Sequence, residues 1–175
     1  PGEIFVMPSS SGPMDSARLA WMLREKIILD VMERMVTGGV ELNVYNERVR
    51  KYNELAAAIE YKESEMAAAK RAVENMKGEI VRDAMTETIA LSMPLKAQGD
   101  PMSGAVWRVQ KYLSMLGYYP GRVDGVSNEG TVSAVKMFEL KSDAPVTGRI
   151  DEKLADALAG LWVSRNTPAS VGLGD

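Results

Sequence analysis

The sequence predicts an all-α protein, in which a long helical hairpin or coiled-coil stalk precedes a small three-helix module. Apolar residues recur at three- and four-residue spacing along most of the chain, which is the period of an α-helix. Residues 41–91 contain no proline and one glycine, Gly78, so little in them favours a turn. The 12 methionines and the 6% share of aromatic residues are typical of helices packed with flexible aliphatic side chains.

Residues 1–13 are rich in Pro, Gly and Ser and are expected to form an N-terminal arm, held against a neighbouring chain. Asp15 or Ser16 can cap a helix that reaches about Val36 and ends at a Thr-Gly-Gly sequence. The apolar residues of this helix cover more than one stripe, so we expect it to pack on two sides. A tryptophan surrounded by so many apolar residues is more often part of the core than a ligand-stacking residue. Trp21 is also a candidate interface residue.

Residues 14–92 are predicted to form the helical hairpin or coiled-coil oligomerisation region. The stretch 41–91 carries apolar and small residues near the spacing of a coiled-coil seam. One helix of this length would extend about 75 Å at ~1.5 Å per residue and cannot bury its seam alone. It is therefore expected to fold back on the first helix, to bundle with other copies in a homo-oligomer, or both. The seam residues are Tyr52, Leu55, Ile59, Met66, Ala69, Val73, Met76 and Ile80.

Pro94 ends the long helical stretch, and residues 93–103 are predicted to be a linker. Residues 104–162 then show three short helices joined by two turn-rich loops. The first helix has its apolar face at helical spacing and stops at Gly117. Asn128 and Asp151 can cap the second and third helices. The tail, residues 163–175, has loop composition and is expected to be disordered unless a partner holds it.

The motifs of residues 104–162, taken together, resemble the three-helix peptidoglycan-binding domain that is attached to bacterial and phage cell-wall proteins. The resemblance covers about a third of the chain, and most of the matching positions serve the fold. The matching residues are Val106, Gln110, Leu113, Leu116, Gly117, Tyr118, Pro120, Gly121, Asp124, Gly125, Thr131, Ala134, Val135, Phe138, Val146, Thr147, Gly148 and Asp151.

This resemblance implies peptidoglycan as the partner and places the ligand near the first loop. A binder of wall polymers needs an aromatic face for a sugar ring and polar groups nearby. Tyr119 and Arg122 are expected to be the most exposed of these groups, since Tyr118 is a semi-buried position in the family. The binding candidates are Tyr119, Arg122, Asp124, Ser127, Asn128 and Thr131. The chain departs from the family pattern at Ser127, Asn128 and Glu139, where an aromatic residue, a glycine and a glutamine are usual.

A second stripe on the first helix of the module joins Trp107, Lys111 and Met115 at four-residue spacing. An exposed stripe of this kind usually forms an interface. Trp107 and Met115, with Trp21, are therefore the candidate interface residues, and they indicate contacts with other subunits of a larger assembly.

The chain has no histidine and no cysteine, which removes Ser-His-Asp and Cys-His catalysis and the usual zinc ligands. We therefore expect no enzyme activity, no metal and no cofactor. A net charge of −3 argues against a nucleic-acid partner. No run of 18 apolar residues predicts a membrane span, and the first residues lack the pattern of a signal peptide.

The function predicted is that of a non-catalytic structural protein that binds the cell wall, displayed on an oligomeric helical stalk as a component of a bacteriophage virion or tail. Its expected location is the virion or the cell envelope, in the periplasm or cell wall. The alternative is a purely structural assembly protein, in which the module mediates subunit contacts; the departures at Ser127, Asn128 and Glu139 favour it. A wall hydrolase with two carboxylates is a third possibility, which the missing His and Cys disfavour.

Overall fold

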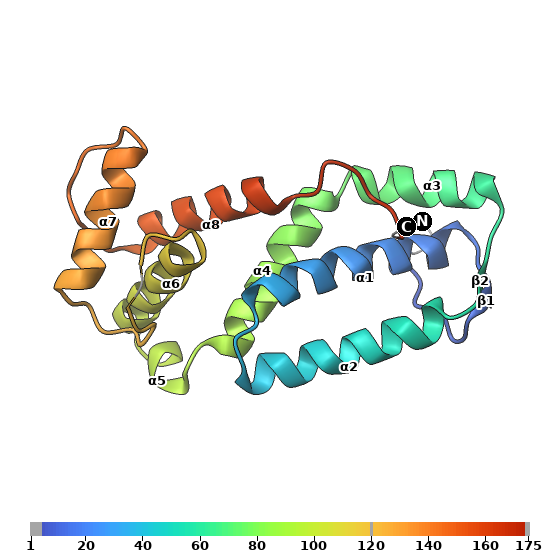
Figure 1. The fold of residues 1–175 in the computed structure, drawn as a ribbon, viewed down its shortest axis with the longest axis horizontal. Helices are drawn as coiled ribbons and strands as arrows, with labels where there is room; N and C mark the ends of the chain where they lie inside the picture. The colour runs from blue at the N-terminus through green and yellow to red at the C-terminus, as the bar shows by residue number, and fades with distance from the viewer. Residues whose placement is uncertain (1–4, 120, 174–175) are drawn as a thin grey trace. The chain divides into compact units, whose positions relative to one another are not determined.

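The computed structural model describes residues 5–119 and 121–173, and it confirms the all-α prediction (Figure 1). Within these residues the chain forms eight helices and one pair of two-residue strands. The chain divides into two compact units. The N-terminal unit comprises Pro1–Leu91 together with Asn166–Asp175, and the C-terminal unit comprises Ser92–Arg165.

The helix α1 (Ser16–Met35) is the centre of the N-terminal unit, where it lies between α2 (Gly39–Ala56) and α3 (Glu63–Glu74) (Figure 1). Its predicted cap is confirmed, because the Asp15 Oδ1 atom accepts a hydrogen bond of 2.9 Å from the backbone N–H of Arg18. The apolar residues of α1 are buried around most of its circumference, as expected for a helix with partners on two sides. Those exposed by less than 2% are Leu19, Ala20, Met22, Leu23, Met32 and Met35.

The prediction of one continuous helix over residues 41–91 is wrong. The stretch divides into α2, α3 and α4 (Lys77–Ser92), with breaks after Ala56 and after Glu74. At the first break the strand β2 (Ile59–Glu60) pairs in parallel with β1 (Gly12–Pro13), and Glu60 O accepts a 2.8 Å hydrogen bond from Met14 N. Backbone groups that a continuous helix would satisfy internally are thus satisfied by the N-terminal arm.

The apolar spacing that predicted a coiled-coil seam comes instead from three shorter helices. Several of the seam residues are buried within the single chain, including Met66, Ala69 and Val73 of α3. Because α3 packs on α1, this part of the seam finds its partner without a second copy. The fold-back of the stretch on the first helix is therefore present, whereas assembly into an oligomer stays a prediction.

The N-terminal arm packs on its own unit over the part that is described. The Val6 N–H donates a 3.2 Å hydrogen bond to Ala17 O, and the Arg24 guanidinium lies 5.6 Å from the centre of the Phe5 ring. Pro8 is buried. The arm was expected to lie against a neighbouring chain, but its described residues find these contacts within their own chain. Residues 1–4 of the predicted arm lie outside the described residues.

The C-terminal unit contains the three predicted helices, α6 (Pro101–Met115), α7 (Glu129–Lys141) and α8 (Glu152–Asn166), preceded by the short helix α5 (Leu95–Gln98). The first of them begins three residues earlier than expected, because Asp100 caps it by accepting a 3.1 Å hydrogen bond from Met102 N. The predicted linker is therefore largely helical. At Gly104 a Cβ atom would lie 2.9 Å from Ala97 O, so glycine allows α5 to approach α6.

The ends of these helices follow the predicted local signals. Gly117, with φ of +82°, ends α6, and its N–H and that of Tyr118 donate to Ser114 O and Leu113 O at 3.1 and 2.8 Å. Asp151 Oδ1 accepts a 2.9 Å hydrogen bond from Leu154 N at the start of α8. The helices bury a common apolar core, whose least exposed aliphatic residues are Val109, Leu113, Val135 and Leu158.

The tail after α8 is held by the N-terminal unit of the same chain. Glu74 Oε1 accepts a 2.8 Å hydrogen bond from the backbone N–H of Val171, and Lys77 Nζ donates at 2.8 Å to Ala169 O. The Val171 side chain is only 7% exposed. The tail was expected to be disordered without a partner, and α3 and α4 provide that partner for the residues that are described.

Candidate functional site

The buried side chain of Gln110 organises the first loop of the C-terminal unit, residues 117–128. Gln110 comes from α6 and is 0% exposed. Its Oε1 atom accepts hydrogen bonds from the backbone N–H groups of Asp124 at 3.0 Å and Gly125 at 2.9 Å. Its Nε2 atom donates to Val126 O at 3.0 Å and to Thr131 Oγ1 at 3.1 Å. A single amide therefore fixes the loop backbone and connects it to the first turn of α7.

Tyr119 is part of this buried network, so the prediction that it is exposed is wrong. Its side chain is 5% exposed, and its hydroxyl donates a 3.1 Å hydrogen bond to Arg122 O. A Cβ atom at Gly121 would lie 2.5 Å from the Tyr119 ring, so only glycine fits over the ring there. Tyr119 thus supports the loop from inside and offers no free face for a sugar. Pro120, part of the predicted turn, lies outside the described residues.

The other candidates divide into an exposed group and a buried one. Arg122, Asp124, Ser127 and Asn128 are exposed. Thr131 is 0% exposed, and its N–H donates a 2.9 Å hydrogen bond to Asn128 Oδ1, which confirms the predicted cap of α7. The exposed group lies on one loop that is fixed from below by Gln110.

The charges of the loop are set by short-range contacts. The backbone N–H of Val126 donates a 3.0 Å hydrogen bond to Asp124 Oδ1 and is the main cause of the lowered pKa of that carboxyl, with smaller contributions from Gln110 and Arg122. The Arg122 side chain makes no hydrogen bond or ion pair with any residue that the structure describes. The loop therefore presents an ionised carboxylate and a guanidinium whose five donors are available.

The second loop, residues 142–151, is held by Glu139, one of the positions where the chain departs from the family pattern. The Glu139 carboxylate accepts hydrogen bonds from the backbone N–H groups of Thr147 and Gly148 at 2.7 and 2.8 Å, and from Thr147 Oγ1 at 2.6 Å. Burial would raise the pKa of Glu139, but these hydrogen bonds outweigh it and lower the pKa. The glutamate that stands where the family usually has a glutamine thus holds the second loop by accepting these hydrogen bonds.

The second loop is expected to loosen in acid because of Glu139. A carboxyl whose pKa is lowered by folding stabilises the fold above its ordinary value, here 4.5, and loses this effect as the pH falls through the folded value. The amide resonance of Gly148, followed by NMR, should therefore titrate with a midpoint below 4.5. In Glu139→Gln this transition should vanish, because the amide does not titrate. Its oxygen can still accept from the two backbone N–H groups, and its Nε2 can donate to Thr147 Oγ1. A midpoint at or above the ordinary value would contradict the assignment.

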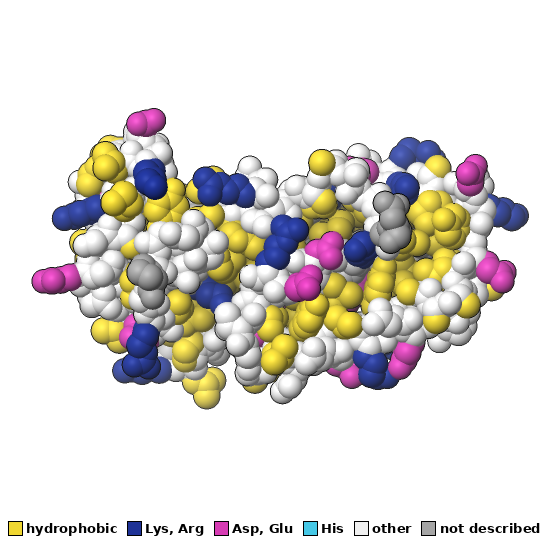
Figure 2. Space-filling model, in the orientation of Figure 1, with side chains coloured by type: hydrophobic (Ala, Val, Ile, Leu, Met, Phe, Trp, Pro, Cys, Tyr) yellow, Lys and Arg dark blue, Asp and Glu magenta, His cyan; other side chains and the backbone are white. Residues whose placement is uncertain are grey.

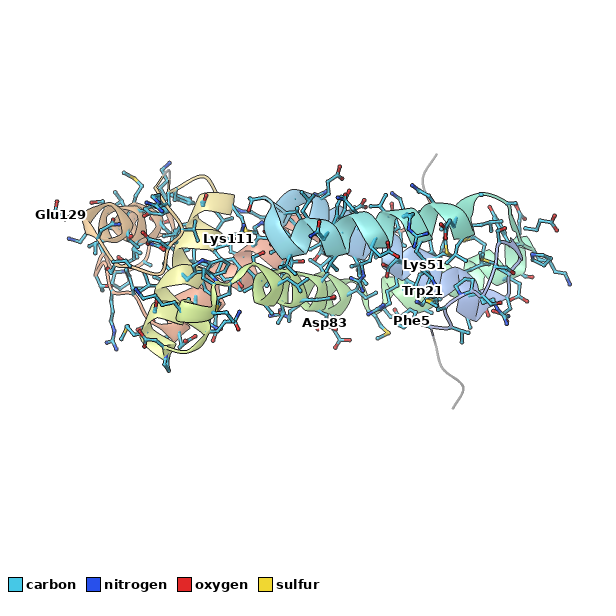
Figure 3. All side chains as sticks on the ribbon, turned by 90° about the horizontal axis from the view of Figure 1, so that it is seen from below. Phe5, Trp21, Lys51, Asp83, Lys111 and Glu129 are labelled. Carbon is cyan, nitrogen blue, oxygen red and sulfur yellow. The ribbon has the colours of Figure 1, made fainter. Side chains whose placement is uncertain are left out.

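The candidate interface residues are less exposed than predicted. Trp107 and Lys111 are only 3% and 6% exposed, and Met115 is half-buried, so the exposed stripe expected on this helix is absent. Trp21, which lies between Phe5 and Lys51 in Figure 3, is half-buried at a groove of about 290 Å³. Of the three candidates, Trp21 and Met115 keep part of their surface accessible.

Sequence reasoning missed the roles of Gln110 and Glu139. Both are positions of the family pattern, but the pattern alone does not predict that either side chain holds a loop. A usable signal was present at Gln110, because a polar residue that lies between Val109 and Leu113 on an apolar helix face needs several buried partners. At Glu139 the partners come from a loop eight residues away, and no local pattern indicates them.

Comparisons with known proteins identify the C-terminal unit. Residues 103–158 match the family model described as a putative peptidoglycan binding domain. No curated protein and no solved structure matches the chain. Within the described residues, no helix is both long and apolar enough to cross a membrane, and no cluster of three or more Asp or Glu side chains could hold a metal ion. The matched residues contain Gln110 and the loop that it fixes, and the C-terminal unit therefore carries a domain of the three-helix peptidoglycan-binding family.

Proposed function

We propose that the chain attaches to peptidoglycan through the exposed group of the first loop, without cleaving the polymer. A peptidoglycan-binding domain supports a role at the cell wall. The observation that carries the proposal is the loop itself, where Arg122, Asp124, Ser127 and Asn128 are exposed on a backbone fixed by Gln110. Peptidoglycan offers carboxylates, amides and hydroxyls, and a free guanidinium is well suited to a carboxylate. A rigid loop loses little conformational entropy on binding.

The electrostatics of the loop support binding without hydrolysis. A glycosidase needs a carboxylic acid whose pKa is raised so that it can protonate the leaving group. The carboxyl of Asp124 has a lowered pKa and is ionised at neutral pH. Zymography of the purified chain in a gel that contains cell walls tests this directly: we expect no cleared band, and a cleared band would refute the non-catalytic part of the proposal.

We also propose that the N-terminal unit holds the domain on a larger assembly, in the cell envelope or a bacteriophage virion, as several copies. Multiple copies would let a weak single site bind a repeating polymer strongly. Val40 and Leu42 at the start of α2 are 60% and 38% exposed, which supports contact with another subunit.

The alternative, that the domain itself forms subunit contacts, is favoured by a different observation. Met137 and Leu140, three residues apart on α7, are 48% and 62% exposed, and Val146 is 52% exposed. Exposed apolar side chains of this kind are typical of a protein–protein contact.

Replacing Arg122 is expected to weaken attachment to the wall. The wild-type chain should sediment with insoluble peptidoglycan, and Arg122→Ala should bind about tenfold more weakly, since one charge-assisted hydrogen bond is lost. Arg165→Ala, which removes another exposed arginine of the same unit, should bind like the wild type. Tyr119→Ala is unsuitable here because it would disrupt the loop from within. If the wild type stays in the supernatant, the domain has no wall affinity and the subunit-contact alternative is favoured.

A further inference from the structure

A hollow of about 500 Å³ in the N-terminal unit lies outside the matched domain. It is lined by α1, α3, the residue that follows β2, and the tail segment 168–173. Its floor is apolar, since Ile27 and Met66 are 5% and 8% exposed. Figure 2 shows hydrophobic side chains gathered over α1 and α3, next to side chains of Lys and Arg. The hollow thus combines an apolar floor with a charged rim.

The tail segment 168–173, which forms one side of the hollow, is fixed in place. Besides accepting from Val171 N, the Glu74 carboxylate pairs with Lys77 Nζ at 2.7 Å, and Lys77 in turn donates to Ala169 O. The Lys77 contact is the largest cause of the lowered pKa of Glu74, and the Val171 N–H adds to it. The hollow is therefore bounded on this side by a segment that Glu74 of α3 and Lys77 of α4 anchor through two hydrogen bonds, and these two side chains also pair with each other.

Two polar groups of the rim have no partner among the described residues, and a third is only weakly paired. Tyr61 is 50% exposed, and its hydroxyl makes no hydrogen bond to a described residue. Lys70 of α3 is exposed and has no ion-pair partner among those residues. Lys26 of α1 lies 3.7 Å from Asp30, a long and exposed pair. The hollow is therefore lined by two ammonium groups and one carboxylate beside the aromatic ring, so its net charge is positive.

We infer that this hollow binds an amino sugar that carries a short peptide with a free carboxylate, as the muramyl peptide units of peptidoglycan do. The ring would stack on Tyr61, and Lys70 and Lys26 would neutralise the carboxylate. The choice of ligand rests on the proposed function, because a chain that attaches to peptidoglycan meets this chemistry at every repeat. Two sites on one chain, one in each unit, would raise avidity for a polymer.

Titration of the full chain with muramyl dipeptide, followed residue by residue through backbone amide resonances in NMR, tests the inference. We expect saturable shifts at Ile27, Tyr61, Lys70 and Gly172. Lys70→Ala should weaken this binding about tenfold through the loss of a charge-assisted contact, and Tyr61→Ala should do the same through the loss of stacking. Tyr61→Phe, which keeps the ring, and Lys153→Ala, which removes an exposed lysine of α8, should bind like the wild type. The neutral sugar N-acetylglucosamine should bind at least about tenfold more weakly, because it brings no charge to Lys70.

The outcomes separate this inference from the proposed function. If the chain sediments with peptidoglycan but muramyl dipeptide leaves the hollow unperturbed, or shifts only residues near Arg122, the inference is overturned and wall attachment stands. If the hollow responds to muramyl dipeptide but the chain does not sediment with peptidoglycan, the site is real and the proposed function fails. Equal binding by Lys70→Ala and the wild type would overturn the role given to charge.

Discussion

Gln110→Ala is expected to lower the free energy of unfolding of the C-terminal unit by about 3–5 kcal/mol, which would leave much of it unfolded at room temperature. The substitution empties a fully buried position and leaves the backbone N–H groups of Asp124 and Gly125 without acceptors. It also removes the donor to Val126 O and Thr131 Oγ1. Each buried group left unpaired adds its own desolvation cost to that of the cavity.

The effect can be measured on the C-terminal unit alone. The chain has 3 tryptophans, and Trp107 and Trp162 belong to this unit whereas Trp21 belongs to the other. In a Trp21→Phe background, denaturant unfolding followed by tryptophan fluorescence reports on the C-terminal unit. The matched control is Gln98→Ala, which removes the only other glutamine; its side chain is exposed and donates to Met93 O. An unfolding midpoint for Gln110→Ala as high as that of the control would contradict the central role of this amide.

Arg48→Ala should destabilise the N-terminal unit by about 2–4 kcal/mol, because it leaves a buried carboxylate without its partner. Glu25 of α1 is 4% exposed, and its Oε1 atom lies 3.3 Å from Arg48 Nε of α2. The Arg48 guanidinium also contacts Glu87 of α4 at 3.3 Å, so one side chain connects three helices. This expected loss of stability is smaller than the full cost of breaking a buried ion pair, because 27% of the Arg48 side chain is exposed.

The pH dependence of this loss identifies its cause. Burial raises the pKa of Glu25 above its ordinary value of 4.5, against the lowering effect of Arg48 and Arg24. A carboxyl whose pKa is raised by folding stabilises the fold below the ordinary value and loses this contribution as the pH rises through the folded value. Removing Arg48 raises the pKa of Glu25 further. The difference in stability between Arg48→Ala and the wild type should therefore be small in acid and large at neutral pH.

Two variants serve as controls for the ion pair. Glu25→Gln in the Arg48→Ala background removes the unpaired charge and should restore part of the lost stability at neutral pH. Arg50→Ala, which breaks pairs with Glu47 and Glu54 that are exposed by about 60%, should change the stability little. A loss for Arg48→Ala that is independent of pH would show that Arg48 acts through packing and not through its charge.

The parts of the fold that the sequence predicted depend on local signals. Asp15, Asn128 and Asp151 cap helices where the pattern placed them, because a cap needs only the next few backbone N–H groups. The breaks within residues 41–91 were missed for the opposite reason. Ala57 and Ala58 favour a helix by themselves, and the chain turns there because β2 pairs with an arm nearly 50 residues away.

The arrangement of the candidate site residues could be predicted only in part, and their role in binding stays a prediction. The resemblance placed it on the first loop, and the structure brings the named residues together there. Which of two adjacent tyrosines faces inward could not be read from the sequence, because it depends on where the loop places Arg122 O, the acceptor for the Tyr119 hydroxyl. Tyr118 instead makes an edge-to-face contact with Phe138, 5.6 Å between ring centres, and stays half-buried.

The tail held by Glu74 makes the peptidoglycan-binding domain an insertion. Residues 166–173 follow this domain in the chain but belong to the unit that precedes it. During synthesis on a ribosome, α1 to α4 emerge long before Val171, so the first unit completes its fold only after the inserted one has been made. A protease that cuts between α4 and α5 would not release the domain at once. The anchored tail would still hold the two fragments together through noncovalent contacts.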